Sequence, residues 1–218
     1  MVLKQKLITL PDIEPLKRLS QSLAMLDAIM SPEWEYRYYS FNSKWNKGEM
    51  MASMRNGSGD EYFILFNSHG AILKGFAHES PMSPFANEPP EVWRGVLDDV
   101  PIEFQGFLTE PAFSIEETTF CIWRRYSDVS WQIGNIDYPE DDNPDGSEDL
   151  LWILDGNPET YQYFAAEYYE QDIHLSAVQH IYEHKPLTDN IISELNADVS
   201  KRELRKDIKE IGYPNTQI

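Results

Sequence analysis

The stretch YFILFNSHGAILKGF, residues 62–76, contains the pattern that decides the fold. Its first part, residues 62–66, is an apolar run short enough for a buried strand. The polar tetrapeptide at 67–70 is a turn signal, and residues 71–76 form a second run of the same kind. Two such runs joined by a short turn predict an antiparallel hairpin.

Two further candidate strands precede this hairpin. Residues 36–41 are bulky and aromatic, and residues 49–55 form another run that ends at the strong turn signal NGSG, residues 56–59. Four runs with short turns predict an antiparallel meander. Later runs at 118–125 and 130–136 extend the predicted antiparallel sheet to five or six strands.

Helical patterns stand on both sides of the sheet region. Residues 12–30 predict an N-terminal helix, because apolar residues recur there at steps of three and four. From residue 148 onward the period is again helical. The shorter helices are expected at 91–97, 101–109, 149–154, 176–184, 188–195 and 200–211, with one more that begins at Asn157-Pro158-Glu159 and carries Tyr161 to Tyr169.

This order of elements predicts an α+β fold, with a sheet-rich part at 34–136 and a helical part at 148–212. The chain has 218 residues, of which 41% are hydrophobic and 13% aromatic, which is enough to bury a core. Because a domain typically holds about 100–200 residues, we expect residues 1–218 to form a single domain.

Composition and charge exclude several functional classes. The 37 acidic and 18 basic residues leave a net charge of −19, which argues against nucleic acid as a partner. No segment approaches the ~18 apolar residues of a membrane span, and residues 1–8 lack the features of a signal peptide. The single cysteine, Cys121, cannot form an internal disulfide and lies in an apolar run, so we expect an inert core thiol and a cytoplasmic protein.

The charge is unevenly distributed along the chain. The 59 residues between Arg125 and Lys185 contain 14 carboxylates and neither lysine nor arginine. A solvated face that keeps the protein soluble explains this stretch, and so does a docking surface for a basic protein. Tyrosines among the carboxylates favour docking, because tyrosine is enriched in interfaces. The candidate partner-binding residues are Asp141, Asp142, Asp145, Glu148, Tyr161, Tyr168 and Tyr169.

One motif suggests zinc. His180-Ile181-Tyr182-Glu183-His184 matches the H-x-x-E-H pattern of inverted zinc peptidases. On a helix, His180 and His184 would share a face and could hold a zinc ion, with Glu183 as general base. Pro186 ends the helix directly afterwards, and a helix-terminal His184 with a packed or exposed His180 explains the same residues.

A second motif suggests calcium. Residues 141–146 fit the first six positions of a calcium loop, with Asp141, Asn143 and Asp145 as oxygen ligands. Trp152 stands where the bidentate glutamate belongs, and an ordinary acidic turn explains the same sequence.

Other chemistry has less support. His78, Glu79 and Ser80 are adjacent in the sequence, whereas a catalytic triad is assembled in space, and no G-x-S-x-G motif is present. No glycine-rich phosphate loop occurs, so no cofactor is expected.

Three stretches, KGFAHESPMSP (74–84), TTFCIWRR (118–125) and IGYP (211–214), resemble segments of an uncharacterised bacterial protein family. That resemblance implies no activity and no site. In size, acidity, α+β order and tryptophan content the chain also resembles the SMI1/KNR4-like (SUKH) immunity proteins of bacterial toxin systems, which implies a binding protein.

Together these patterns predict a non-enzymatic module that docks a basic protein partner. The alternatives are a zinc-dependent hydrolase that uses His180, Glu183 and His184, and a calcium-binding module.

Overall fold

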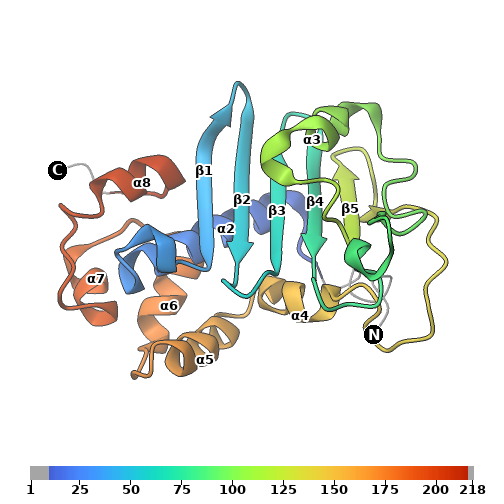
Figure 1. Cartoon of the computed structure of the whole chain (residues 1–218). Helices are drawn as coiled ribbons and strands as arrows, with labels where there is room; N and C mark the ends of the chain where they lie inside the picture. Colours follow the sequence, from blue (N-terminus) through green and yellow to red (C-terminus); the bar gives the residue numbers. More distant parts are fainter. Residues whose placement is uncertain (1–9, 216–218) are drawn as a thin grey trace.

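The computed structural model describes residues 10–215, so residues 1–8, on which the signal-peptide expectation depends, lie outside the described part. The strands form one six-stranded sheet. Figure 1 shows helix α2 (Ile13–Met30) behind this sheet. On the side of strand β1 (Tyr39–Asn46) it shows the helices α5 (Pro158–Tyr168), α6 (Leu175–Tyr182), α7 (Asp189–Leu195) and α8 (Arg205–Ile211). This arrangement confirms the predicted α+β fold. Within residues 10–215, no helix is both long and apolar enough to cross a membrane.

The six strands follow one another across the sheet in sequence order, and every neighbouring pair is antiparallel. The hairpin predicted from residues 62–76 forms, with Glu61 opposite Phe76 and Phe66 opposite Ala71. The strands are β1 (Tyr39–Asn46), β2 (Glu49–Arg55), β3 (Glu61–Phe66), β4 (Gly70–Phe76), β5 (Phe120–Arg125) and β6 (Gln132–Ile133).

Both faces of the central strands are covered. Successive strand side chains point to opposite faces, so β3 contributes Ile64 to one core and Phe63 and Leu65 to the other. Helix α2 and the C-terminal helices pack against this first face of the sheet and contribute to the first core. Residues of the 82–113 segment, among them Met82 and Phe107, cover the other face. Because these strands are buried on both faces, residues 62–66 and 71–76 are nearly continuous apolar runs.

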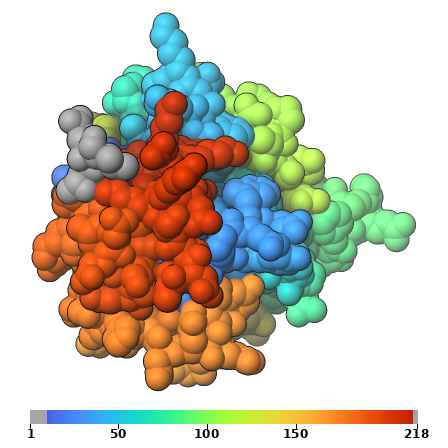
Figure 2. Space-filling model, turned by 90° about the vertical axis from the view of Figure 1, so that its left-hand side faces the viewer, coloured from blue at the N-terminus to red at the C-terminus, as the bar shows by residue number. Residues whose placement is uncertain are grey.

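The C-terminal part is helical, as predicted. Its elements are α4 (Ser147–Leu151), η5 (Trp152–Asp155), α5 (Pro158–Tyr168), α6 (Leu175–Tyr182), α7 (Asp189–Leu195) and α8 (Arg205–Ile211). Short helical turns η2 (Pro84–Ala86), η3 (Ile102–Phe104), α3 (Gln105–Thr109) and η4 (Pro111–Phe113) lie in the covering segment, and η1 (Trp34–Tyr36) precedes β1. Figure 2 shows the orange and red C-terminal helices packed beside the blue segment that leads into β1, with the β1–β2 hairpin projecting above them.

A buried carboxylate connects three of these elements. Asp27 of α2 is completely buried, and its Oδ2 accepts a hydrogen bond from the Tyr39 N–H at 2.8 Å. Its Oδ1 accepts one from the Tyr161 hydroxyl of α5 at 3.0 Å. Asp27 therefore fixes the start of β1 and the position of α5 on the long helix.

Some predicted elements are wrong in extent. The first strand was expected at 36–41 but runs over Tyr39–Asn46, because residues 34–36 form the turn η1. The last helix was expected at 200–211, but α8 begins only at Arg205. Before that helix begins, the Ser200 N–H donates to the Glu203 carboxylate at 2.8 Å.

Two further predictions are wrong where two distant segments of the backbone touch. Residues 91–93 are irregular and residues 94–97 form turns instead of a helix, because Gly95 has a positive φ of 92°. A Cβ on Gly134 would lie 1.9 Å from the Gly95 carbonyl oxygen, so the two segments touch there. The strand expected at 130–136 is therefore reduced to Gln132–Ile133, because the chain leaves the sheet at this contact.

Candidate functional site

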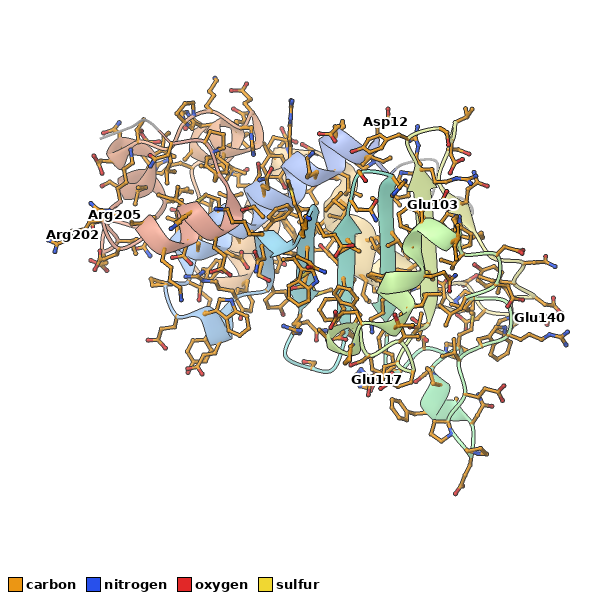
Figure 3. All side chains as sticks on the ribbon, turned by 90° about the horizontal axis from the view of Figure 1, so that it is seen from above. Asp12, Glu103, Glu117, Glu140, Arg202 and Arg205 are labelled. Carbon is orange, nitrogen blue, oxygen red and sulfur yellow. The ribbon has the colours of Figure 1, made fainter. Side chains whose placement is uncertain are left out.

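Part of the stretch without lysine or arginine, the loop around Glu140, lies far from the basic C-terminal end, whereas helix α6 of the same stretch packs against α7. Figure 3 shows Glu140 near one end of the molecule and Arg202 and Arg205 at the opposite end. The acidic loop that follows Glu140 leads into α4. The loop around Glu140 therefore places a group of carboxylates at the end of the molecule opposite to Arg202 and Arg205.

Hydrogen bonds of side chains and backbone groups hold the acidic loop in a defined conformation. The Asn143 N–H donates to Asp141 Oδ1 at 2.9 Å, and the Glu148 N–H donates to Asn143 Oδ1 at 3.1 Å. The Asn143 amide donates to Asp149 Oδ2 at 3.0 Å. The loop is also fastened to the segment after β4, because the Met82 N–H donates to the Pro144 carbonyl at 3.1 Å.

This fastening creates a hollow of about 320 Å³ between residues 77–81 and 141–150. We call it the acidic hollow. Four carboxylates line it, and none of the described residues that line it is a lysine or an arginine. The carboxylates are those of Asp60, Glu79, Asp141 and Asp149. The hollow therefore presents a local excess of negative charge around a space that can admit a side chain.

One histidine also lines the acidic hollow. His78 Nδ1 lies 2.9 Å from Asp60 Oδ1, which also accepts the His78 N–H at 2.9 Å. The hydrogen bond to Asp60 raises the pKa of His78 above its usual 6.5. Burial raises the pKa of Asp60, but the hydrogen bonds from His78 outweigh this and lower it overall. His78 is therefore a titratable charge inside an otherwise acidic site.

Asp145 does not belong to the docking surface, which corrects the sequence interpretation. Its side chain is completely buried, and Oδ1 accepts the Ser147 N–H at 3.0 Å. Burial raises its pKa. The Thr119 hydroxyl donates to the Asp145 carbonyl at 2.7 Å and so joins the loop to the residue directly before β5. Asp145 is a structural residue beneath the loop, whereas Asp141 and Asp142 are exposed and Glu148 is half-buried.

The tyrosines of α5 divide in the same way. Tyr161 is completely buried against Asp27 and is not a surface contact, which again corrects the interpretation. Tyr169 is half-buried, and its hydroxyl is enclosed. Tyr168 is 44% exposed, and Tyr163, which lies among the same carboxylates but is not one of the candidate partner-binding residues, is 65% exposed. These tyrosines lie in one helix or directly after it. Side chains point outward all round a helix, so some of the rings enter the core and others face solvent.

The geometry required for zinc is absent at His180 and His184. Helix α6 ends at Tyr182, and His184 follows with a left-handed φ of 56°, so the two imidazoles do not share a helical face. His180 Nε2 lies 3.0 Å from the Pro186 carbonyl, and Glu183 forms an ion pair with Lys185. Over residues 10–215, no three His, Cys, Asp or Glu side chains are grouped so that they could hold a metal ion.

The residues of the calcium motif already have structural partners. The oxygens of Asp141, Asn143 and Asp145 accept backbone N–H groups of the same loop. These hydrogen bonds correspond to the alternative interpretation, an ordinary acidic turn. Cys121 is buried in β5, and burial raises its pKa to about 12, which agrees with an inert thiol.

The sequence did not point to Asp60, His78 and Glu79 as members of one site with the loop at 141–150. No spacing rule connects residues so far apart, and only the antiparallel pairing that places the ends of the strands together could reveal it. No protein-family model, no curated protein and no solved structure matches this chain.

Proposed function

We propose that this chain is a non-enzymatic binding module, immunity-like in its role, that docks a basic protein partner in the cytoplasm. The observation that carries the proposal is the acidic hollow, with four carboxylates and neither lysine nor arginine among its described lining residues. Lysine or arginine side chains of a partner would enter this hollow and pair with the carboxylates.

Charge and exposed tyrosine act at different stages of docking. A net charge of −19 attracts a basic partner over a distance and raises the association rate, an effect that salt weakens. Tyr163 and Tyr168 add contact area together with a hydroxyl group that tolerates partial exposure. Complementary charge therefore selects the partner and raises the association rate, and the tyrosines slow dissociation of the complex.

The first prediction concerns Glu79, which lines the acidic hollow, and two carboxylates of the adjoining loop, Glu140 and Asp142. The triple variant Glu79→Lys, Glu140→Lys, Asp142→Lys keeps the turn made by Asp141 and changes the charge only at exposed positions. At low salt, association with the partner should slow by about tenfold or more, and its salt dependence should flatten. The measurement is affinity capture from the source organism's lysate, followed by association kinetics with the captured partner at low and high salt.

A matched control carries the same total change of charge elsewhere. Glu194→Lys, Asp198→Lys, Glu210→Lys alters three exposed carboxylates on α7, on α8 and between them. This control should retain most of the wild-type rate. Equal binding by wild type and both triple variants, or a bait that retains no basic protein at either salt, would overturn the proposal.

The second prediction concerns pH. Protonation of His78 adds a positive charge to the acidic hollow, and the raised pKa places this change above 6.5. Binding should therefore weaken by a few-fold as the pH falls from about 8 to about 6. Protonated His78 also pairs with Asp60 in the folded protein and so adds to folding stability. This contribution is present at low pH and is lost as the pH rises through the raised pKa of His78.

His78→Gln separates this effect from titration of the partner. The ratio of wild-type to variant affinity should change across the pH range, because groups on the partner cancel in the ratio. A ratio that stays constant between pH 8 and pH 6 would show that His78 has no part in docking.

A further inference from the structure

A second cavity lies where two distant segments of the chain cross, and it shares no lining residue with the acidic hollow. Its volume is about 460 Å³, within the ~300–1,000 Å³ of small-molecule sites. Figure 1 shows this part of the chain on the side of β5, opposite to α7 and α8. We call it the Trp93 cavity, and its lining residues are Trp93, Arg94, Asp98, Asn135 and Asp137.

Close backbone contact holds the two segments of the Trp93 cavity together. A Cβ on Gly95 would lie 2.2 Å from the Asn135 carbonyl oxygen, and a Cβ on Gly134 would lie 1.9 Å from the Gly95 carbonyl oxygen. Only glycine allows this approach. The Trp93 indole N–H donates to the Asp137 carbonyl at 3.0 Å and so spans the same crossing. The cavity is therefore preformed, and a ligand need not order the chain in order to bind.

Trp93 contributes an aromatic surface to this cavity. Its side chain is half-buried and packs against the core that contains Met82 and Phe107, which holds the ring in place. Over residues 10–215, no other aromatic ring and no lysine or arginine stacks on the indole. The exposed part of the ring is therefore available to a ligand with an apolar face.

The polar side chains around the indole mix hydrogen-bond donors with acceptors. Arg94 only donates, and the carboxylates of Asp98 and Asp137 only accept. The Asn135 amide does both. All four side chains are exposed, and none has a hydrogen bond or ion pair to another residue of the described range 10–215. One guanidinium and two carboxylates leave a net charge of only −1 at this site.

From this arrangement we propose that the Trp93 cavity binds a neutral saccharide. A hydroxyl group both donates and accepts, so neighbouring hydroxyls of one sugar satisfy a carboxylate and a guanidinium together. The C–H groups on the face of a sugar ring are apolar and stack on the negative face of an indole. An anion would be repelled by Asp98 and Asp137, and a cation by Arg94, whereas a neutral ligand with many hydroxyls meets neither repulsion.

The test uses the whole chain labelled with ¹⁵N and four neutral disaccharides: maltose, cellobiose, lactose and sucrose. The indole N–H signal of Trp93, identified by its loss in Trp93→Phe, should shift saturably with at least one of them. The indole signal of Trp34, which is 60% exposed and lies outside this cavity, should stay in place. Hexa-lysine, inorganic phosphate and glycine at the same concentration represent a cation, an anion and a zwitterion, and each should shift the Trp93 signal less.

Two variants test the polar contacts. Asp98→Ala and Arg94→Ala should each weaken binding of the disaccharide by several-fold, and both should fold because these exposed side chains have no partner within residues 10–215. Glu91→Ala is the matched control, because it removes an exposed carboxylate that is near in sequence but does not line the cavity.

Three results would overturn the saccharide site. They are a Trp93 signal that none of the four disaccharides moves, an equal shift of the Trp34 signal, and unchanged binding by either Asp98→Ala or Arg94→Ala. A larger shift with hexa-lysine, phosphate or glycine would assign the cavity to that class of ligand instead. None of these results bears on docking at the acidic hollow, so the two proposals stand or fail separately.

Discussion

Replacement of Lys74 by alanine should lower the free energy of unfolding by about 3–5 kcal/mol, the largest single effect expected in this protein. Lys74 stands in the middle of β4, and its side chain is completely buried. Its ammonium group pairs with Glu61 at 3.3 Å and donates to the Glu117 carbonyl at 2.9 Å and the Ser114 carbonyl at 3.3 Å. It thereby fastens the segment before β5 to the sheet.

Two physical terms add up in Lys74→Ala. The buried stem is removed, which leaves a cavity, and the Glu117 carbonyl loses its donor. Lys74→Met is the matched variant, because it keeps the buried stem and removes only the ammonium group. We expect it to cost about 1–3 kcal/mol. Equilibrium urea unfolding of the three proteins measures both terms, and a loss below about 1 kcal/mol for the alanine variant would contradict this account.

The second large effect is a dependence of stability on pH that comes from Asp27. Burial raises the pKa of this carboxyl from 3.8 to about 6, although hydrogen bonds from the Tyr39 N–H and the Tyr161 hydroxyl oppose the shift. The folded state therefore binds the Asp27 proton more tightly than the unfolded state does. Between about pH 4 and pH 6 stability falls as the pH rises, and above pH 6 it reaches its lower plateau for this group.

The magnitude follows from the two pKa values. A shift from 3.8 to about 6 corresponds to about 3 kcal/mol over the full range, of which about 1.4 kcal/mol separates pH 7.5 from pH 5. Unfolding in urea at these two pH values measures this difference. In Asp27→Asn the difference should be smaller by that amount, because the titrating group is gone. An unchanged difference in the variant would assign the pH dependence to other groups.

Local patterns predicted those elements whose residues interact with their neighbours in the sequence. The hairpin of β3 and β4 and the helix α2 fall close to where the apolar runs and the three- and four-residue steps placed them. The apolar runs that predict these strands are easy to recognise, because a strand buried on both faces needs an apolar residue at almost every position.

Errors arose where a distant segment decides the local conformation. Gly95 adopts its positive φ beside Gly134, and a helix at 91–97 is lost as a result. The acidic hollow needs Asp60 and His78 beside the loop at 141–150, a proximity that no local pattern encodes.

The sequence by itself determined the α+β class, the antiparallel sheet, the acidity of residues 126–184 and the inert environment of Cys121. Each of these follows from composition or from a short period along the chain. Only the tertiary structure decided which acidic and aromatic side chains face solvent. Asp145 and Tyr161 are buried while Asp141 and Tyr168 are exposed, because the surroundings of a side chain are set by the elements packed against it.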